Sequence, residues 1–439
     1  MNDVLVIGGG LAGVEAAWAL ANKGIPVTIA EMKPKKHSPA HKTDMLAELV
    51  CSNSLKAQRI GSAAGLLKAE MEILGSICVE CAKKCSVPAG GALAVDRDKF
   101  SAMITEKIKE HPLITVECRE VTEIPDGNVI VAAGPLASDA LAEKIKELCG
   151  GSLSFFDAAA PIVTDESIDK TCAFTQSRYD RGGEDDYLNC PMNKEEYEFF
   201  YNELVNAESA ETHSFDKKKG VYEGCMPIEV MASRGADTMR FGPLKPVGLR
   251  DPRTGHRPWA VLQLRREDAS GTMYNLVGFQ TNLKFGEQKR VFSLIPALKN
   301  AEFVRYGVMH RNTFIDSPRH LNSDFSFRGC DGLYFAGQIT GVEGYMESAS
   351  SGILAGLNMA RRLNGEEPLS LPNYTMLGAL SGYISNETVE NFQPMGANFG
   401  ILPPLDDTIR DKKLRYEALA QRSLEFYRKE KPVYENGLK

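Results

Sequence analysis

The chain of 439 residues lacks any run of about 18 consecutive apolar residues, which is the length that a membrane-spanning helix needs. Its N-terminus also lacks a basic segment followed by a long apolar core, because the first apolar run, residues 4–7, is only long enough for a strand. We therefore expect a cytoplasmic protein with no membrane partner.

A surplus of positive charge is missing as well. Lys and Arg number 51 against 58 Asp and Glu, which gives a net charge of −7 and does not indicate nucleic-acid binding. Basic stretches occur at residues 245–257 and 412–415. Most such stretches are solvated surface, so charge alone leaves the partner undecided.

The ten cysteines lack the spacing of a small disulfide-rich domain, and we expect most of them to be reduced thiols. Three of them, Cys78, Cys81 and Cys85, form a CxxCxxxC pattern that is compatible with zinc or an iron–sulfur cluster. No fourth ligand stands nearby and two lysines lie inside the segment. Three incidental thiols are therefore the better interpretation, and we expect no metal.

What the chain does have is a glycine motif at its start. A predicted strand at residues 4–7 leads directly into Gly8, Gly9, Gly10, Leu11, Ala12 and Gly13, and a predicted helix follows. A second predicted strand ends on Glu31, eighteen positions after Gly13. A GxGxxG pattern alone is weak, but this strand–turn–helix–strand context is the one that a dinucleotide site requires. A glycine-rich turn without a ligand is the alternative, and this context disfavours it.

Each glycine of such a motif has a physical task. Gly8 permits the tight turn, Gly10 lets the backbone approach a pyrophosphate, and Gly13 lets the helix pack closely on the strand. The first helical turn directs free N–H groups and its positive dipole end at the phosphates. Glu31 is placed to accept hydrogen bonds from an adenosine ribose.

Both FAD and NAD use this motif, so the ligand must be inferred from later segments. Residues 128–135 predict a buried strand, and residues 332–338 predict another that leads into glycine. A glycine turn at 341–344 and a helix rich in small residues at 349–363 follow. A late strand that returns to the nucleotide fold is typical of flavoproteins of the two-dinucleotide type, so we favour FAD, although an ordinary buried strand and helix is the alternative. A second GxGxxG is missing, which suggests that NAD(P)H visits the flavin only transiently.

The predicted fold is α/β, with a Rossmann-type FAD-binding domain of the two-dinucleotide type and an inserted mixed α/β substrate domain. The length suits two or three domains, and 43% hydrophobic with 25% charged residues is ordinary for a globular protein. We place the domains at residues 1–157, 158–314 and 315–439. Further predicted elements are helices at 63–74, 97–109 and 406–429 and strands at 259–264 and 274–279.

Several segments resemble a known family. They are residues 8–17 (GGGLAGVEAA), 49–55 (LVCSNSL), 87–97 (VPAGGALAVDR), 222–229 (YEGCMPIE), 246–255 (PVGLRDPRTG) and 337–345 (GQITGVEGY). In this order, over nearly the whole chain, they are similar to the folate- and FAD-dependent tRNA (uracil-5-)-methyltransferases, TrmFO. The related GidA/MnmG flavoproteins share the nucleotide motif, but they carry a long C-terminal helical extension for which a chain ending at Lys439 has no room.

The resemblance implies a methyltransferase that modifies tRNA. A one-carbon unit would pass from 5,10-methylenetetrahydrofolate, by way of reduced FAD, to carbon 5 of a T-loop uridine. NAD(P)H would supply the electrons that complete the methyl group of 5-methyluridine. Because carbon 5 of uracil is a poor nucleophile, the site needs a thiolate that adds to carbon 6 and a base that removes the carbon 5 proton.

Two cysteines match these needs through the family motifs. Cys225 stands in a Gly-Cys-Met-Pro turn and is assigned as the uracil nucleophile. Cys51 precedes Ser52, Asn53 and Ser54, which are good helix caps, and a thiol at a helix start has a stabilised thiolate. By resemblance Cys51 approaches the flavin and acts as the base or holds the resting one-carbon adduct. For the other cysteines, burial as apolar residues is the expectation.

Further residues receive roles from the resemblance. Gly337, Gln338, Gly341 and Tyr345 would bind the cofactor, with Tyr345 near the isoalloxazine. His310 would stack on the pterin or meet its glutamate tail, although a lone histidine is more often structural. The remaining candidates are three arginines that could bind tRNA phosphates or folate carboxylates, or could simply be solvated: Arg250, Arg253 and Arg257.

Two other functions stay open at this stage. One is a flavin enzyme with another substrate, such as a GidA-like modifier of wobble uridine. The other is a non-catalytic, flavin-bearing tRNA-binding protein, which would need a basic surface but not the two cysteines. The sequence leaves open the preference between NADH and NADPH, the tRNA footprint, the oligomeric state and the division of labour between Cys51 and Cys225.

Overall fold

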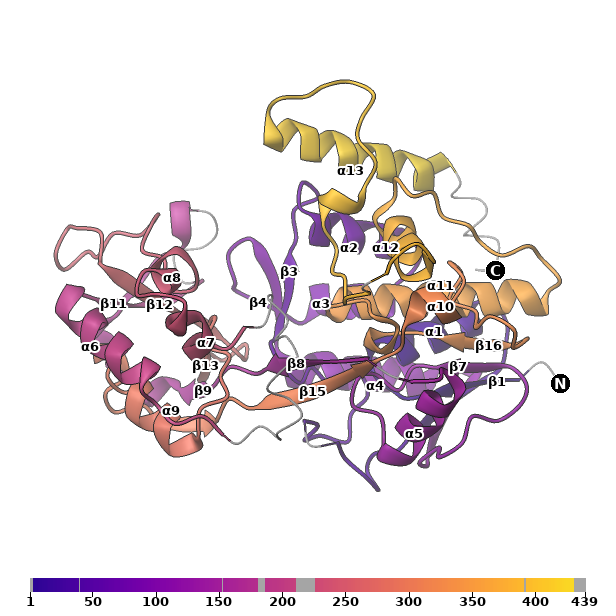
Figure 1. Ribbon diagram of the computed structural model, residues 1–439, viewed down its shortest axis with the longest axis horizontal. Helices are drawn as coiled ribbons and strands as arrows, with labels where there is room; N and C mark the ends of the chain where they lie inside the picture. The colour runs from indigo at the N-terminus through magenta and orange to yellow at the C-terminus, as the bar shows by residue number, and fades with distance from the viewer. Residues whose placement is uncertain are drawn as a thin grey trace.

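The computed structural model describes residues 3–38, 40–151, 153–180, 186–210, 226–390 and 392–429, and only the backbone of residues 153–158, 180, 310 and 311. Figure 1 shows a larger part, which holds both marked ends of the chain, and a smaller part beside it. Two extended strands run between these parts. No helix in the described ranges combines the length and the apolar character needed to span a bilayer.

The larger part is built on a parallel sheet. Its strands are β1 (Val4–Ile7), β2 (Val27–Glu31), β6 (Ile114–Cys118), β7 (Val129–Val131) and β16 (Leu333–Phe335), in the order β16-β7-β1-β2-β6. Every neighbouring pair in this sheet is parallel. The predicted α/β fold is therefore confirmed, and the late strand β16 does return to the nucleotide sheet beside β7.

Two helices with small residues pack against each other in this part. They are α1 (Leu11–Asn22) and α11 (Tyr345–Leu363). A Cβ atom on Gly352 would lie 2.1 Å from the carbonyl oxygen of Ala12, and one on Gly356 would lie 2.6 Å from that of Ala16. The glycines of α11 therefore allow backbone-to-backbone contact, which explains the small-residue composition of this helix.

The remaining elements of the larger part surround this layer. They are β3 (Ser54–Ala57), β4 (Ser86–Val87) and β5 (Ala92–Val95), which form a small antiparallel sheet, and the helices α2 (Ala63–Ile73), α3 (Ile77–Lys84), α4 (Arg97–Glu110), α5 (Asp139–Leu148), α10 (Ser317–His320), α12 (Met376–Ser385) and α13 (Lys412–Lys429). The helices predicted at 63–74 and 97–109 are confirmed as α2 and α4.

Two predicted helix starts are wrong. The helix predicted from residue 349 begins at Tyr345, directly after Gly344, whose φ of +121° ends the preceding turn. The helix predicted from residue 406 begins at Lys412 instead. There the Oδ1 atom of Asp411 accepts a hydrogen bond from the backbone N–H of Leu414 at 2.8 Å, which is the geometry of an N-cap.

The smaller part holds an antiparallel sheet in the order β10-β11-β12-β13-β9-β14. Its strands are β9 (Ile162–Thr164), β10 (Phe174–Thr175), β11 (Leu188–Met192), β12 (Ala260–Arg266), β13 (Met273–Leu276) and β14 (Phe303–Arg305), and its helices are α6 (Lys194–Val205), α7 (Ile228–Ser233), α8 (Thr238–Phe241) and α9 (Phe285–Phe292). This sheet has its own hydrophobic core, with residues from Val163 to Ala301.

The two parts are joined by β8 (Leu153–Ala158) and β15 (Met309–Phe314), which pair antiparallel and lie between them in Figure 1. The predicted boundaries at residues 157 and 314 fall inside or at the end of these strands. We keep a domain division at this ribbon as a proposal.

Candidate active site

A cavity lies where several parallel strands end, and its volume is about 1080 Å³ when the solvent-filled opening is included. Its walls come from the segments that follow β1, β2, β7 and β16 and from the start of α11. The carboxyl ends of parallel strands are where α/β sheets bind nucleotides. Of the residues predicted to bind the cofactor, the lining includes Gly8, Gly9, Gly10, Leu11, Ala12, Glu31, Gly337, Gln338 and Tyr345.

The three glycines of the motif have the geometry that their predicted tasks need. Gly8 has a φ of +105°, and a Cβ there would lie 2.6 Å from the carbonyl oxygen of Ala132. A Cβ on Gly13 would lie 1.9 Å from the carbonyl oxygen of Gly8, so only glycine lets α1 start this close to β1. A Cβ on Gly10 would meet no atom within 4 Å, so a side chain there would project into open space beside the cavity.

Glu31 is buried and forms part of the cavity wall. Its Oε2 atom accepts a hydrogen bond from the backbone N–H of Gly9 at 2.8 Å, and its Oε1 atom accepts one from the N–H of Lys33 at 3.0 Å. The carboxylate thus connects the end of β2 to the glycine turn. Its position beside the turn fits the predicted contact with a ribose.

The second glycine turn lies beside the start of α1, because a Cβ on Gly337 would lie 3.1 Å from the Cβ of Ala12. Gly337 has a φ of +88°, and its N–H donates to the hydroxyl of Ser351 at 2.7 Å. The amide of Gln338 donates to Glu343 at 2.6 Å. Gly341 has a φ of +82°, and a Cβ there would lie 2.4 Å from the ring of Phe392. The other two residues predicted to bind the cofactor, Gly13 and Gly341, are not part of the cavity lining given above.

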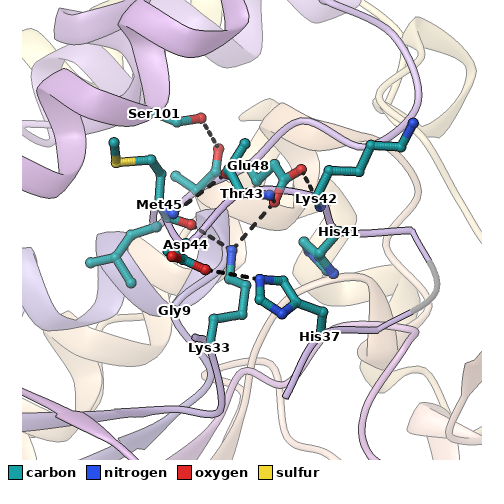
Figure 2. A network of polar contacts seen from close by, with 12 residues as sticks. Gly9, Lys33, His37, His41, Lys42, Thr43, Asp44, Met45, Glu48 and Ser101 are labelled. Carbon is teal, nitrogen blue, oxygen red and sulfur yellow. Dashed lines mark hydrogen bonds and ion pairs between the residues drawn. The ribbon is translucent and has the colours of Figure 1, made fainter. Parts of the chain in front are cut away.

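A polar segment closes the cavity next to Glu31, and the sequence offered no motif for it. Figure 2 shows its network: Nζ of Lys33 donates to the carbonyl oxygen of Met45 at 2.5 Å and lies 3.5 Å from Oε2 of Glu48. Lys33, His41 and Glu48 all line the cavity. Burial lowers the pKa of His41, and the Lys33 ammonium lowers it further, so the imidazole is neutral at pH 7.

Glu48 is held by the same segment. Burial raises the pKa of its carboxyl, but hydrogen bonds from the backbone N–H groups of Lys42 at 2.8 Å and Thr43 at 3.2 Å outweigh that effect, so the pKa is lowered overall. The nearby pair of His37 and Asp44, 3.0 Å apart, completes the network in Figure 2. This wall therefore presents an ammonium, a carboxylate and a neutral imidazole to the cavity.

Cys51 follows Val50, which lines the cavity, and its backbone contacts Tyr345 at the N-terminus of α11. The phenol oxygen of Tyr345 accepts hydrogen bonds from the backbone N–H groups of Cys51 at 2.7 Å and Ser52 at 3.3 Å. The predicted helix start at Cys51 is wrong, because the strand β3 follows at Ser54. Ser52, Asn53 and Ser54 are occupied by other partners, so Cys51 does not stand at the start of a helix formed by these residues.

Arginines surround the segment of residues 49–53 instead, and the sequence analysis missed them. Arg97 at the start of α4 donates to the carbonyl oxygens of Leu49 at 2.7 Å and Cys51 at 3.0 Å. Arg265 in β12 donates to the side chains of Ser52 at 2.8 Å and Asn53 at 2.9 Å. Arg305 at the end of β14 donates to the carbonyl oxygen of Val50. No local pattern could have revealed them, because they come from three distant segments.

Two predicted site residues cannot be compared with this geometry. Cys225 lies outside the described residues. His310 lies in β15, paired with Asp157 of β8, and its side chain is outside the described part. The predicted roles of both residues stay predictions.

The three arginine candidates lie in the segment between α8 and β12, away from the cavity lining given above. Arg250 and Arg257 are exposed. Arg253 forms a two-pronged ion pair with Asp251, at 3.0 and 2.7 Å, and also donates to the carbonyl oxygen of Thr171 at 2.8 Å. Its guanidinium is therefore engaged by its own loop, whereas those of Arg250 and Arg257 face solvent.

The CxxCxxxC segment forms part of α3 and its C-terminal cap. Cys78, Cys81 and Cys85 are buried. Burial raises the pKa of Cys78 well above its usual value, with a further contribution from Glu15, and burial raises that of Cys81 to about 12. Within the described ranges, no cluster of three or more His, Cys, Asp or Glu side chains is arranged to hold a metal ion.

Comparison with known proteins places this geometry in context. A family model described as "Glucose inhibited division protein A" matches residues 3–367. The methylenetetrahydrofolate–tRNA-(uracil-5-)-methyltransferase TrmFO of Acetivibrio thermocellus is 59% identical over 426 residues, which is 97% of each chain. The TrmFO of Lactobacillus johnsonii is 57% identical over 438 residues, which is 99% of this chain and 100% of that one.

Among solved structures, Aquifex aeolicus GidA is similar in two crystal forms. Both give a TM-score of 0.70, with 16% and 17% sequence identity, and the match covers 98% of this chain and 73% and 76% of those chains. At this identity the likeness concerns the fold alone.

Proposed function

This chain belongs to the TrmFO family, within the wider glucose inhibited division protein A family, and from that premise we propose its reaction. It is a methylenetetrahydrofolate–tRNA-(uracil-5-)-methyltransferase that uses FAD and forms 5-methyluridine in the T-loop of tRNA. The observation that carries this proposal is the identity of 59% over 97% of both chains. The GidA-like alternative has much weaker support, with 16% identity to Aquifex aeolicus GidA.

The cavity has the features that FAD needs. Gly10 leaves open space beside the backbone where a side chain would otherwise project, and the N-terminus of α1 faces the same side. Gly8 to Gly10 would hold the pyrophosphate, Glu31 the ribose, and the turn from Gly337 to Tyr345 the ring system. When bound, FAD would supply the electron transfer and the one-carbon carrier function that join folate to uracil.

The two cysteines would divide the remaining chemistry. The Cys225 thiolate would add to carbon 6 of the uracil and so make carbon 5 nucleophilic. After carbon 5 has formed its new bond, a base must take its proton, and the thiolate then leaves carbon 6. Cys51, beside the proposed ring position at Tyr345, is our candidate for that base or for holding the resting one-carbon unit.

We also propose that NAD(P)H is the reductant and that the protein works in the cytoplasm, where its tRNA and folate substrates are. His310, Arg250 and Arg257 stay our candidates for folate or tRNA contacts. Arg253 is the weaker candidate, because Asp251 already engages it.

Nucleoside mass spectrometry tests the function directly. An unmodified tRNA transcript is incubated with the holoenzyme, NADPH and methylenetetrahydrofolate labelled in its one-carbon unit. We expect labelled 5-methyluridine from the wild type and from Cys330→Ala, a control that removes a half-buried thiol outside the family motifs. Cys225→Ala should form none while it still binds FAD. Absence of labelled 5-methyluridine from a yellow, reducible wild-type protein would overturn the proposed function.

A further inference from the structure

The segment of residues 49–53 is enclosed by buried positive charge. Arg265 is only 6% exposed, and the side chain of Arg97 is 14% exposed. Arg305 is half-buried. Each of these guanidiniums donates hydrogen bonds to the segment, either to backbone carbonyl oxygens or to the side chains of Ser52 and Asn53.

Fewer carboxylates than arginines lie beside this segment. Glu267 pairs with Arg97 through two contacts, at 2.5 and 3.3 Å. Among the described residues, neither Arg265 nor Arg305 forms an ion pair with a carboxylate. Three guanidiniums therefore share one carboxylate. An arginine does not lose its proton in a protein, so this surplus persists at every physiological pH and favours an additional anion.

The field of this cluster reaches its neighbours. Lys42 lies near the same segment, and burial followed by the charge of Arg305 lowers its pKa. Glu48 opposes this shift and Arg97 adds to it, and the pKa is lowered overall. An added cation is thus disfavoured here. The opposite must hold for a group that gains negative charge at the same place.

Cys51 is that group. Its N–H is bound by Tyr345 and its carbonyl oxygen by Arg97, so its backbone is fixed from two sides. An ionised Cys51 would interact with Arg97, Arg265 and Arg305 alike. Among the described residues, the other titratable groups facing this cluster are Glu267, Tyr345, Tyr187 and Lys42, and of these only Glu267 is an anion at neutral pH.

We propose that Arg97, Arg265 and Arg305 are positioning residues for Cys51, which fix its backbone and stabilise its side chain as the thiolate. The part that Cys51 plays in methyl transfer rests on the proposed function, whereas the thiolate itself does not. Arg265 and Arg305 belong to the antiparallel part, and Arg97 and Tyr345 belong to the nucleotide part. The reactive form of Cys51 is therefore assembled by the contact between the two parts.

The test measures the ionisation of Cys51 without using enzymatic activity. Holoenzyme is treated briefly with iodoacetamide between pH 5 and pH 9.5, and labelling of the peptide that contains Cys51 is followed by mass spectrometry. The thiolate sulfur forms a bond to carbon and iodide leaves, so the rate follows the thiolate fraction. In the wild type we expect the midpoint of the rate to fall below about pH 7.5, in the range of thiols beside cationic groups.

Four variants separate charge from architecture. Arg265→Gln and Arg305→Gln should move the midpoint upward by about one pH unit, which slows labelling about tenfold at pH values below the wild-type midpoint. Arg265→Lys and Arg305→Lys keep the charge and should keep most of the wild-type midpoint. The matched control is Arg290→Gln, an arginine of the same part whose partners Glu203 and Glu287 lie on the surface. It should leave the profile of Cys51 unchanged.

Several outcomes would overturn the proposal. One is an ordinary midpoint near about pH 8.5 in the wild type, or a Cys51 peptide that stays unlabelled below pH 9. Another is a Gln variant that changes the rate equally at every pH without moving the midpoint, because that is the signature of a loosened segment. A low wild-type midpoint that rises in the Gln variants, together with absence of 5-methyluridine, would instead leave this proposal intact and reject the proposed function.

Discussion

Two of the regions in which the protein buries charge satisfy that charge in opposite ways. In the nucleotide part, Glu15 accepts hydrogen bonds from the N–H groups of Ile77 and Cys78 at the start of α3. Glu70 accepts them from Met376 and Leu377 at the start of α12, at 2.7 and 2.9 Å. Around residues 49–53, buried arginines donate to backbone carbonyl oxygens instead.

The two arrangements differ in what they can do when the pH changes. A buried carboxyl escapes the cost of its charge by binding a proton, and burial raises the pKa of both Glu15 and Glu70 to about 7. A guanidinium has no such escape. Its region must therefore provide anions, which here are Glu267 and, in our proposal, Cys51. The first kind of site anchors helices, whereas the second can prepare a reactive group.

The largest effect should come from removing the carboxylate of the arginine region. Glu267→Ala leaves Arg97 buried without its ion-pair partner, and we expect the free energy of unfolding to fall by about 3–5 kcal/mol. Chemical denaturation of the holoenzyme measures it. Asp331→Ala removes an exposed carboxylate from Arg362 and should lose at most about 1 kcal/mol. Equal losses of unfolding free energy in the two variants would show that burial of the ion pair does not set its contribution.

Glu70, in the region of buried carboxyls, should make the free energy of unfolding depend on pH. The pKa of Glu70 rises from 4.5 to about 7 on folding, so the folded state holds its proton more tightly. This contribution is complete below pH 4.5 and is lost as the pH rises through about 7, a change of up to about 3 kcal/mol. Glu70→Gln should abolish that part of the pH dependence.

Thermal unfolding between pH 4.5 and pH 8 measures this change, with Glu72→Gln as the control. Glu72 lies on the same helix, but its side chain is exposed and pairs with Lys83. We expect the stability advantage of the wild type over Glu70→Gln to shrink as the pH rises, and the difference from Glu72→Gln to stay constant. A difference from Glu70→Gln that is independent of pH would show that Glu70 stays ionised throughout.

A smaller effect should follow from Tyr345→Phe, which removes one neutral acceptor beside residues 51 and 52. The phenol oxygen binds the N–H groups of Cys51 and Ser52, so its loss leaves both without that partner and should cost about 1 kcal/mol of unfolding free energy. FAD should still bind. Tyr416→Phe, whose ring packs on Phe399, is the control and should change stability less. Loss of FAD from Tyr345→Phe would mean that the hydroxyl serves the cofactor instead.

The smallest effect should come from Arg253→Gln. Arg253 has the same two-pronged pairing with a carboxylate as Arg97, but its side chain is 40% exposed. Asp251 itself is only 5% exposed, but it keeps the hydrogen bond from the backbone N–H of residue 253 at 2.9 Å, and the amide of the new glutamine can donate to it. We therefore expect the unfolding free energy to change by at most about 1 kcal/mol. Equilibrium denaturation checks this value against that of Glu267→Ala. A loss as large as that of Glu267→Ala would mean that exposure is not what separates the two pairs.

The sequence by itself determined the nucleotide half of the site. The turn from Gly8 to Gly13 depends on contacts between neighbouring elements, and steric limits on a Cβ leave glycine as the only residue that fits at Gly13. Helices such as α2 and α4 could likewise be predicted, because the apolar spacing that indicates them is also a local property of the sequence. Family motifs added Cys51 and Tyr345, which the structure brings together.

Only the tertiary structure decided what surrounds Cys51. Ser52 and Asn53 resemble helix caps but accept hydrogen bonds from Arg265, and Ser54 begins the strand β3. Long-range hydrogen bonds therefore outweigh the local preference for capping. Glu70 likewise looks like one more charged residue of a helix, yet its partners lie some three hundred residues further along the chain. Buried charges choose partners by proximity in space and by the cost of leaving water, and neither is visible in the order of residues.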